Sequence, residues 1–219
     1  MTLLQRPRFR TDTVSAIRVF SRFSLGNLVL VSSATLDSRR ELIVSSAFDV
    51  LREEGIEHFT VAGVAKKSGL SRPAVYQYFD STSHILTELV LNDMSDLVNE
   101  LERLLAGLDD PLEQVRVWVH YSVSYLASNH HSVIKTIGRD RIPADQLPVV
   151  GAMHGFLMTS LTTPLKELGA GNAESVAAMI YGAVDAAATR ITAGASYLLE
   201  VQALESFILD RFNGSPSSD

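Results

Sequence analysis

Apolar residues recur at intervals of three and four along almost the whole 219-residue chain, and this spacing restricts the fold more than any other feature. Alternation of apolar and polar residues, which is typical of half-buried strands, is scarce. Glycines, prolines and capping residues divide the periodic segments into pieces of helix length. The sequence therefore predicts an all-α protein of about nine helices.

Capping residues and glycines set the expected limits of these helices. A first helix should follow the cap pair Asp37-Ser38 and end before Gly55. Residues 130–150 contain Gly138, Pro143 and Pro148 and should be less regular. The other long helices are expected over residues 83–105, 110–129, 153–168, 173–193 and 196–212.

The composition excludes several classes of protein. With 46% hydrophobic residues the chain is too apolar to be disordered, and no apolar run approaches the roughly 20 residues that a membrane-spanning helix needs. The absence of cysteine rules out disulfides, thiolate metal sites and a cysteine nucleophile. We therefore expect a cytoplasmic protein that does not associate with membranes.

The charge is unevenly distributed along the chain. The net charge of −6 divides into +4 for residues 1–36, −1 for residues 37–85 and −9 for residues 86–219. An acidic total therefore does not prevent a locally basic N-terminal part from binding nucleic acid.

Residues 60–79 have the pattern of a helix-turn-helix. Thr60 and Ser71 are each placed to cap a short helix, and Gly69 lies between the two helices. The outer face of the second helix carries side chains suited to phosphates and base edges, namely Arg72, Ala74, Tyr76, Gln77 and Tyr78. This segment is therefore a candidate DNA-binding element.

The same segment resembles the TetR family of bacterial transcriptional regulators. The resemblance covers residues 39–86 and includes Gly69-Leu70-Ser71, the aromatic group around Tyr78-Phe79 and the connection from Glu54 to Thr60. It implies that Thr60, Tyr76 and Tyr78 contact phosphates, whereas Arg72, Pro73, Ala74 and Gln77 face bases. The family commonly has a lysine where this chain has Thr82, so Arg39, Arg40, Lys66 or Lys67 would supply part of the phosphate contact. The candidate DNA-binding residues are Arg39, Thr60, Lys66, Ser71, Arg72, Pro73, Ala74, Tyr76, Gln77 and Tyr78.

The resemblance also implies a domain order. A three-helix DNA-binding domain over residues 37–85 would precede a larger helical domain over residues 86–213, which binds an effector and dimerises. A disordered basic extension over residues 1–36 and a polar tail over residues 214–219 would flank them. We expect that the extension reflects a start codon assigned too far upstream. The alternative is a basic arm that follows DNA.

Aromatic, methionine and polar residues of the C-terminal helices are candidates for effector binding, because the corresponding helices of the resembled family surround a small-molecule cavity. They are Trp118, Tyr121, Tyr125, His154, Phe156, Met158, Tyr181 and Asp185. The alternative is that most of them belong to an ordinary core, as residues at helical spacing usually do.

The last two helices suggest a dimer. Small residues at 182–188 permit close approach of helices, and the final helix carries apolar residues on adjacent faces at Leu198, Val201, Leu204, Ile208 and Phe212. One chain does not easily cover both faces, which favours a four-helix interface between two copies over an internal bundle.

We find no glycine-rich phosphate loop, no nucleophile elbow and no metal-ligand spacing in the sequence. The chain is therefore not expected to be an enzyme or to need a cofactor or metal. The expected function is a homodimeric repressor that a small-molecule effector releases from a palindromic double-stranded DNA operator. The alternative is a constitutive or protein-responsive DNA-binding protein without a small-molecule ligand.

Overall fold

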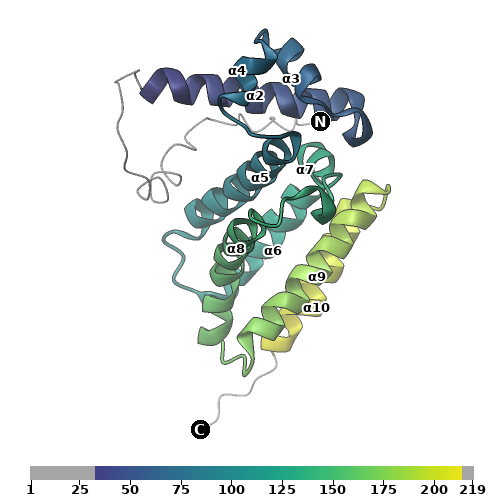
Figure 1. Ribbon diagram of the computed structural model, residues 1–219. Coiled ribbons are helices and arrows are strands. Elements are labelled where there is room, and N and C mark those ends of the chain that lie inside the picture. Colours follow the sequence, from purple (N-terminus) through teal and green to yellow (C-terminus); the bar gives the residue numbers. More distant parts are fainter. Residues whose placement is uncertain (1–32, 214–219) are drawn as a thin grey trace.

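The computed structural model describes residues 33–213, which form nine α-helices and two short 3-10 helices without any strand (Figure 1). The N-terminal elements are α2 (Ser33–Glu54), η1 (Ile56–His58), α3 (Val61–Ser68) and α4 (Arg72–Tyr76). The remaining elements are α5 (Thr82–Leu105), α6 (Pro111–Leu126), α7 (Asn129–Ile134), η2 (Arg139–Arg141), α8 (Leu147–Glu167), α9 (Ala173–Thr192) and α10 (Tyr197–Asn213). The prediction of an all-α fold is confirmed.

The helices α2, α3 and α4 pack together at one end of the molecule (Figure 1). The α2 residues Ile43 and Ala47, which the apolar spacing places on one face, are fully buried. Val64 of α3 and Val75 of α4 are also fully buried and belong to the same hydrophobic cluster. Phe79, which follows α4, is buried in this cluster as well. Since α3 and α4 are too short to be stable alone, their position depends on this shared core.

A second core lies among α5, α6, α8, α9 and α10. Trp118 of α6 is fully buried there, and its Nε1 donates a hydrogen bond to Ser160 Oγ of α8 at 3.0 Å. Leu161 and Leu165 of α8 are equally buried against α6 and α9. The helices α9 and α10 run side by side along one edge of the molecule (Figure 1).

Two elements connect the cores. The helix α5 contributes Leu86 and Leu89 to the N-terminal core and Leu97 and Leu101 to the second one. The short helix α7 contributes Ile134 to the N-terminal core, although it follows α6 in the chain. A change in the larger domain can therefore reach the N-terminal helices through both α5 and α7.

Several expected helix limits are wrong. The helix α2 begins at Ser33, so Asp37 and Ser38 lie inside it and do not cap it. The helix α6 ends at Leu126, because the Ser128 hydroxyl accepts a hydrogen bond from His131 N and starts a separate helix in the segment expected to be irregular. The helix α8 begins at Leu147, where Pro148 occupies a permitted first-turn position. The expectations for residues 1–32 and 214–219 lie outside the described residues.

Candidate nucleic-acid interface

Side-chain caps fix the turn between α3 and α4. Thr60 Oγ1 accepts a hydrogen bond from Gly63 N at 3.1 Å, and Ser71 Oγ accepts one from Ala74 N at 3.3 Å. Gly69 ends α3 with a φ of 69°, in the left-handed region that favours glycine. The predicted caps and turn are thus present. Because both hydroxyls act as acceptors, their protons remain available to donate to a phosphate.

The face of α4 opposite Val75 is open to solvent. Arg72 and Pro73 are exposed, and the Tyr76 side chain is 51% exposed. Ala74 is partly buried. The helix ends at Tyr76, so Gln77 and Tyr78 lie in the turn that follows.

Gln77 is exposed, whereas Tyr78 is partly buried against the N-terminal core. Tyr76 therefore presents more of its ring to a ligand than Tyr78 does.

The basic side chains near this face divide into paired and unpaired groups. Arg40 forms a bidentate bond with Glu88 of α5, and its guanidinium lies 4.7 Å from the centroid of the Phe79 ring. Lys67 Nζ lies 2.7 Å from Glu53 Oε2 of α2. No carboxylate within residues 33–213 pairs with the candidates Arg39, Lys66 and Arg72.

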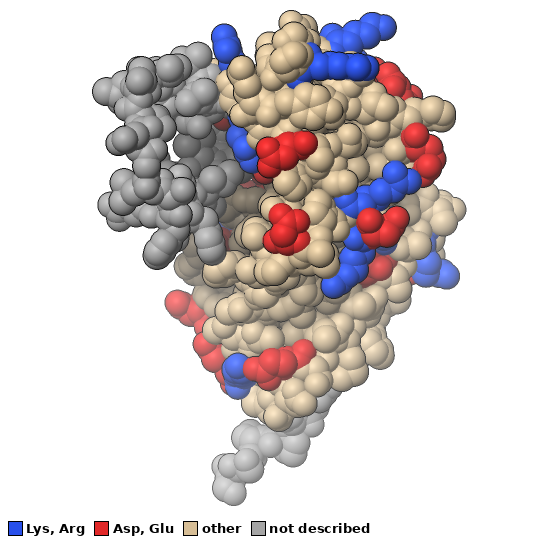
Figure 2. All heavy atoms as spheres, viewed as in Figure 1, with Lys and Arg blue, Asp and Glu red and all other residues tan. Residues whose placement is uncertain are grey.

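Lysine and arginine side chains project from the end of the molecule that carries α3 and α4 (Figure 2). Of the four groups considered as substitutes for a lysine at Thr82, Arg39 and Lys66 thus remain available, whereas Arg40 and Lys67 are engaged within the protein.

The candidate effector residues do not converge on one site. Tyr121 and Tyr125 lie together with ring centroids 6.0 Å apart, and the exposed His154 meets the Tyr181 ring edge-on at 5.4 Å. Trp118 is inside the second core and Met158 packs against it. Phe156 is 55% exposed, and Asp185 forms an ion pair with Lys135 at 2.7 Å.

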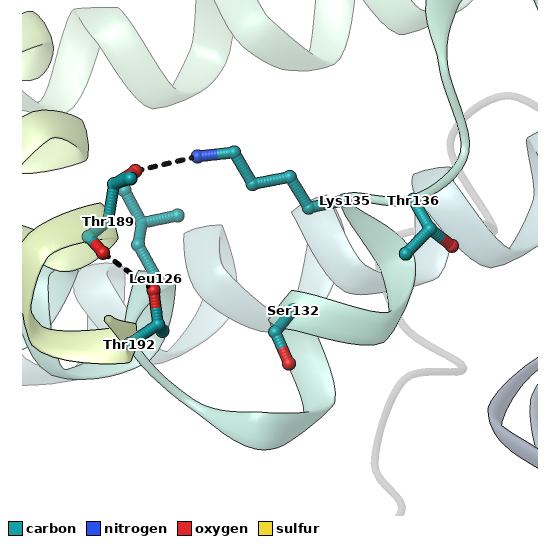
Figure 3. A pocket seen from close by; sticks show the side chains of 6 residues that line it. All are labelled: Leu126, Ser132, Lys135, Thr136, Thr189 and Thr192. Carbon is teal, nitrogen blue, oxygen red and sulfur yellow. Dashed lines mark hydrogen bonds between the residues drawn. The ribbon is translucent and has the colours of Figure 1, made fainter. Parts of the chain in front are cut away.

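Two pockets open among these helices. The first, of about 220 Å³, is lined by Leu126, Ser132, Lys135, Thr136, Thr189 and Thr192 (Figure 3). Lys135 Nζ reaches across it to donate a hydrogen bond to Thr189 Oγ1 at 3.2 Å. The second, of about 490 Å³, is lined by Leu104, Glu113, Arg116, Val117, His120, Tyr121 and Ser124. Of the eight candidate effector residues, only Tyr121 lines either of these pockets.

A buried carboxylate that sequence reasoning missed lies between the two cores. Asp93 of α5 is 3% exposed, and it accepts hydrogen bonds from the Tyr125 hydroxyl at its backbone oxygen (2.8 Å) and at Oδ1 (3.0 Å). His131 Nδ1 of α7 lies 2.8 Å from Asp93 Oδ2, and His130 Nε2 lies 3.7 Å from Oδ1. The His130 ring also stacks on Phe48 of α2, with centroids 4.4 Å apart. We call Asp93, Tyr125, His130 and His131 the junction cluster.

Burial changes the proton affinities around the junction cluster. It raises the pKa of Tyr125, and the negative charge of Asp93 adds to this effect. Burial and the same charge raise the pKa of Asp96, one turn along α5, to about 6. Burial lowers the pKa of His130 against the opposing influence of Asp93. The pairing of Asp93 with Tyr125 and His131 spans 32 and 38 residues, a separation that no sequence pattern signals.

The most exposed of the large apolar residues lie on α9 and α10. Leu198 is 64% exposed and Phe207 is 72% exposed, and Met179 of α9 is 59% exposed. Leu204 and Ile208 are only 6% and 3% exposed and belong to the second core. The final helix therefore has two apolar faces, as expected, but Leu204 and Ile208 lie on the face that packs within the chain.

Residues 33–213 contain no group of three or more histidine, aspartate or glutamate side chains that could hold a metal ion. None of the described helices is long and apolar enough to cross a membrane.

Comparison with known families identifies the N-terminal part. Residues 43–89 match the model of a family described as bacterial regulatory proteins, tetR family. The N-terminal domain belongs to the TetR family. In this TetR domain the matched residues run from α2, through the capped turn and α4, to the first part of α5.

Curated relatives support the same assignment. The HTH-type transcriptional regulator HbdR of Aromatoleum sp. is 28% identical over 97 residues, which are 43% of this chain and 42% of the relative. The HTH-type transcriptional regulator BetI of Stenotrophomonas maltophilia is 34% identical over 82 residues, or 37% of this chain and 42% of the relative. The chain thus matches less than half the length of these relatives. Both relatives are named as regulators and not as enzymes.

Solved structures extend the likeness to the whole fold. The transcriptional regulator FadR from Bacillus subtilis, solved in complex with stearoyl-CoA, superposes with a TM-score of 0.64 at 18% identity. The superposition covers 80% of this chain and 97% of the FadR chain. The TetR domain and the larger helical domain therefore share their arrangement with this structure.

Proposed function

We propose that the protein is a DNA-binding transcriptional regulator that acts as a homodimer in the cytoplasm. The observation that carries the proposal is the exposed face of α4, where Arg72 has no carboxylate partner among the described residues and Lys66 and Arg39 lie unpaired on neighbouring helices. Phosphates bind such cations, and an arginine on a helix that enters the major groove reads guanine edges. The regulators HbdR and BetI, which resemble this chain over its N-terminal part, support the same function.

Roles of the individual residues follow from their positions. Arg72, Pro73, Ala74 and Gln77 would face base edges. Thr60, Ser71, Tyr76 and Tyr78 would contact phosphates beside them, with Arg39 and Lys66 at the margins. Since Tyr76 is more exposed than Tyr78, it is the stronger candidate of the two tyrosines.

Dimerisation would use the outer faces of α9 and α10. Leu198, Leu199 and Phe207 on α10 are each more than 60% exposed, and several large apolar side chains exposed together on one surface helix are typical of an interface. The exposed Gly182 and Ala186 on α9 permit a second pair of helices to approach closely. Two copies would then present their α4 helices to successive major grooves of a palindromic operator.

The regulator would be a repressor that a small-molecule effector releases from DNA. The FadR structure with stearoyl-CoA shows that a protein of this fold accommodates a small-molecule ligand. In this chain an effector would bind beside Tyr121 and Tyr125, near the 490 Å³ pocket. It would favour a dimer whose α4 helices no longer match the operator.

The second candidate function is a DNA-binding protein without a small-molecule effector. The dense packing of Trp118, Leu161 and Leu165 favours it, since these side chains fill the centre of the larger domain. Effector sites commonly have volumes of roughly 300–1,000 Å³, and the smaller pocket falls below that range.

The decisive experiment selects bound duplexes from a random DNA pool with the full chain. Recovery of one palindromic sequence would support a sequence-specific dimeric regulator, whereas recovery of unrelated sequences would contradict it. Small molecules are then added to the purified complex. Release by a compound favours the repressor with an effector, and release by none of a broad panel favours the second candidate.

A further inference from the structure

Few contacts fix the direction of α4. The helix contains five residues, and Val75 is its buried side chain. Phe79, which follows the helix, is 4% exposed and supplies a second anchor, because its amide donates a hydrogen bond to the Val75 oxygen at 3.1 Å. A helix of this length is not stable alone. Its direction therefore depends on these two anchors and on the capped turn at Ser71.

An ion pair between α2 and α5 lies against the second anchor. Arg40 Nε donates a hydrogen bond to Glu88 Oε1 at 3.2 Å, and Arg40 Nη2 donates one to Glu88 Oε2 at 2.7 Å. The same guanidinium lies 4.7 Å from the centroid of the Phe79 ring, within the range of a cation–π contact. We call Arg40, Glu88 and Phe79 the α4 clamp.

We propose that the α4 clamp sets the direction of α4 and thereby determines how well the protein distinguishes its operator from other DNA, without contacting the bases. The inference rests on the proposed function and assigns positioning residues to it.

The geometry of the clamp separates it from an ordinary surface ion pair. Exposed ion pairs contribute little, because water screens their charges and both side chains lose freedom. The Glu88 side chain is only 15% exposed, and both of its oxygens accept from the planar fork of Arg40, which fixes the plane of the guanidinium. This plane lies against a ring that is itself a buried anchor. The clamp therefore restrains the orientation of Phe79.

Both helices that carry the ion pair are firmly placed. Glu88 lies between Leu86 and Leu89, which are buried in the N-terminal core. Arg40 follows the exposed Arg39 in α2, so the clamp also restrains the part of α2 that carries a proposed phosphate contact. The end of α4 is thus held by two longer helices at once.

The direction of α4 matters more for specific binding than for general attraction to DNA. Hydrogen bonds from Arg72 to a base edge need donor–acceptor distances of about 2.7–3.2 Å, so a small tilt of α4 breaks them. The attraction between cations and phosphates changes gradually with distance and depends mainly on the number of charges. Loss of the clamp therefore reduces the preference for the operator and retains the general affinity for DNA.

The test measures the affinities of the full chain for its selected operator duplex and for a duplex of random sequence in the same buffer. Glu88→Gln leaves one uncharged acceptor for Arg40 and frees its cation. We expect the operator affinity to fall about tenfold, which is about 1.4 kcal/mol, while the affinity for the random duplex is retained or rises. Arg40→Lys keeps the charge but lacks the fork, so it should lose operator affinity to a similar extent.

A second ion pair of the same domain provides a matched control. Lys67 Nζ of α3 lies 2.7 Å from Glu53 Oε2 of α2. Glu53→Gln also removes one acid and frees a cation, but the pair makes no bond to α4 or Phe79. It should raise both affinities alike and leave their ratio unchanged. The same unchanged ratio for Glu88→Gln would show a purely electrostatic role and overturn the proposal.

A measurement without DNA separates positioning from overall stability. The amides of Tyr78 and Phe79 both donate to the Val75 oxygen, and their hydrogen-exchange protection should fall at least about fivefold in Glu88→Gln and stay unchanged in Glu53→Gln. Unchanged protection in Glu88→Gln would overturn the clamp. A lower free energy of unfolding in urea with an unchanged operator affinity of the folded protein would also overturn it. Reduced protection in a protein whose wild type prefers no duplex would instead contradict the proposed function and retain the clamp.

Discussion

At the scale of single residues, the structure separates side chains that are held within the protein from those that are free to bind. Arg40 and Arg72 look equivalent in the sequence, but Arg40 bonds Glu88 and covers Phe79, whereas Arg72 has no carboxylate partner within residues 33–213. Arg40 thus fastens α2 to α5 beneath α4, and Arg72 remains available to a ligand.

We predict that Arg72→Ala weakens operator binding by about 1–3 kcal/mol and relaxes the preference at one base position, because a bidentate contact to one base pair is lost. The matched variant Lys66→Ala should weaken binding to all sequences alike and reduce the slope of log affinity against log salt by about one for each subunit of the dimer. The base preference and the salt slope are both measured by titrating each variant with a library of operator sequences at several salt concentrations. A uniform loss for Arg72→Ala would place this side chain on a phosphate.

Asp96 gives a prediction about stability and pH. Its pKa of about 6 in the folded protein exceeds the value of 3.8 for a free aspartate, so the folded state is disfavoured wherever the carboxylate is charged. Asp96→Asn should raise the free energy of unfolding by about 1 kcal/mol at pH 7.5, a value reduced for the partial exposure of the group. This gain in the free energy of unfolding should shrink as the pH falls through 6, because the wild-type carboxylate takes up a proton there, and it should vanish below pH 4.

Urea unfolding at several pH values measures this gain. The exposed Asp109→Asn serves as the control and should show no comparable pH-dependent gain. An Asp96→Asn protein less stable than the wild type at pH 7.5 would show that the carboxylate is needed in its charged form.

At the scale of elements, local sequence signals predicted the turn between α3 and α4 well because its caps are local. Thr60, Ser71 and Gly69 act on groups within four residues, so their roles can be deduced from spacing alone. The limits of α6 and α7 were missed although Ser128 is a good capping residue, since the apolar spacing continues through it.

The buried face of α10 was not predictable from its apolar spacing. Every apolar residue of α10 fits a helical stripe, but which stripe meets α6 and α9 depends on how the helix is rotated against them. The junction cluster was likewise not predictable, because it joins Asp93 of α5 to residues of α6 and α7 that lie 32 and 38 positions further along the chain.

The two faces of α10 can be tested separately. Phe207→Glu changes a side chain that is 72% exposed, so we expect a folded protein that is monomeric and binds the operator weakly. Leu204→Glu places a charge in the second core, where Leu204 is 6% exposed, and should lower stability by several kcal/mol. Sedimentation and thermal unfolding measure these effects. A dimeric Phe207→Glu protein would exclude this face of α10 as the interface.

At the scale of the whole molecule, the proposed DNA-binding face and the proposed dimer face belong to different domains. Lys66 and Arg72 lie on α3 and α4 at one end of the molecule, whereas the exposed apolar residues Leu198 and Phe207 lie on α10 in the larger domain (Figure 1). The spacing of the two α4 helices in a dimer is therefore set by the packing of the larger domains and by α5 and α7, which connect the two cores.

This separation predicts a strict dependence on the spacing of the operator half-sites. Two rigidly connected α4 helices must enter major grooves about 34–36 Å apart, or one helical turn of DNA. Insertion of five base pairs rotates one half-site by about half a turn and should reduce the affinity of the wild-type dimer to that of a single half-site. The monomeric Phe207→Glu variant occupies each half-site independently, so the same insertion should leave its affinity unchanged. Titration of both proteins against the original and the lengthened duplex measures the difference, and equal sensitivity of the two proteins would contradict a dimer built through α9 and α10.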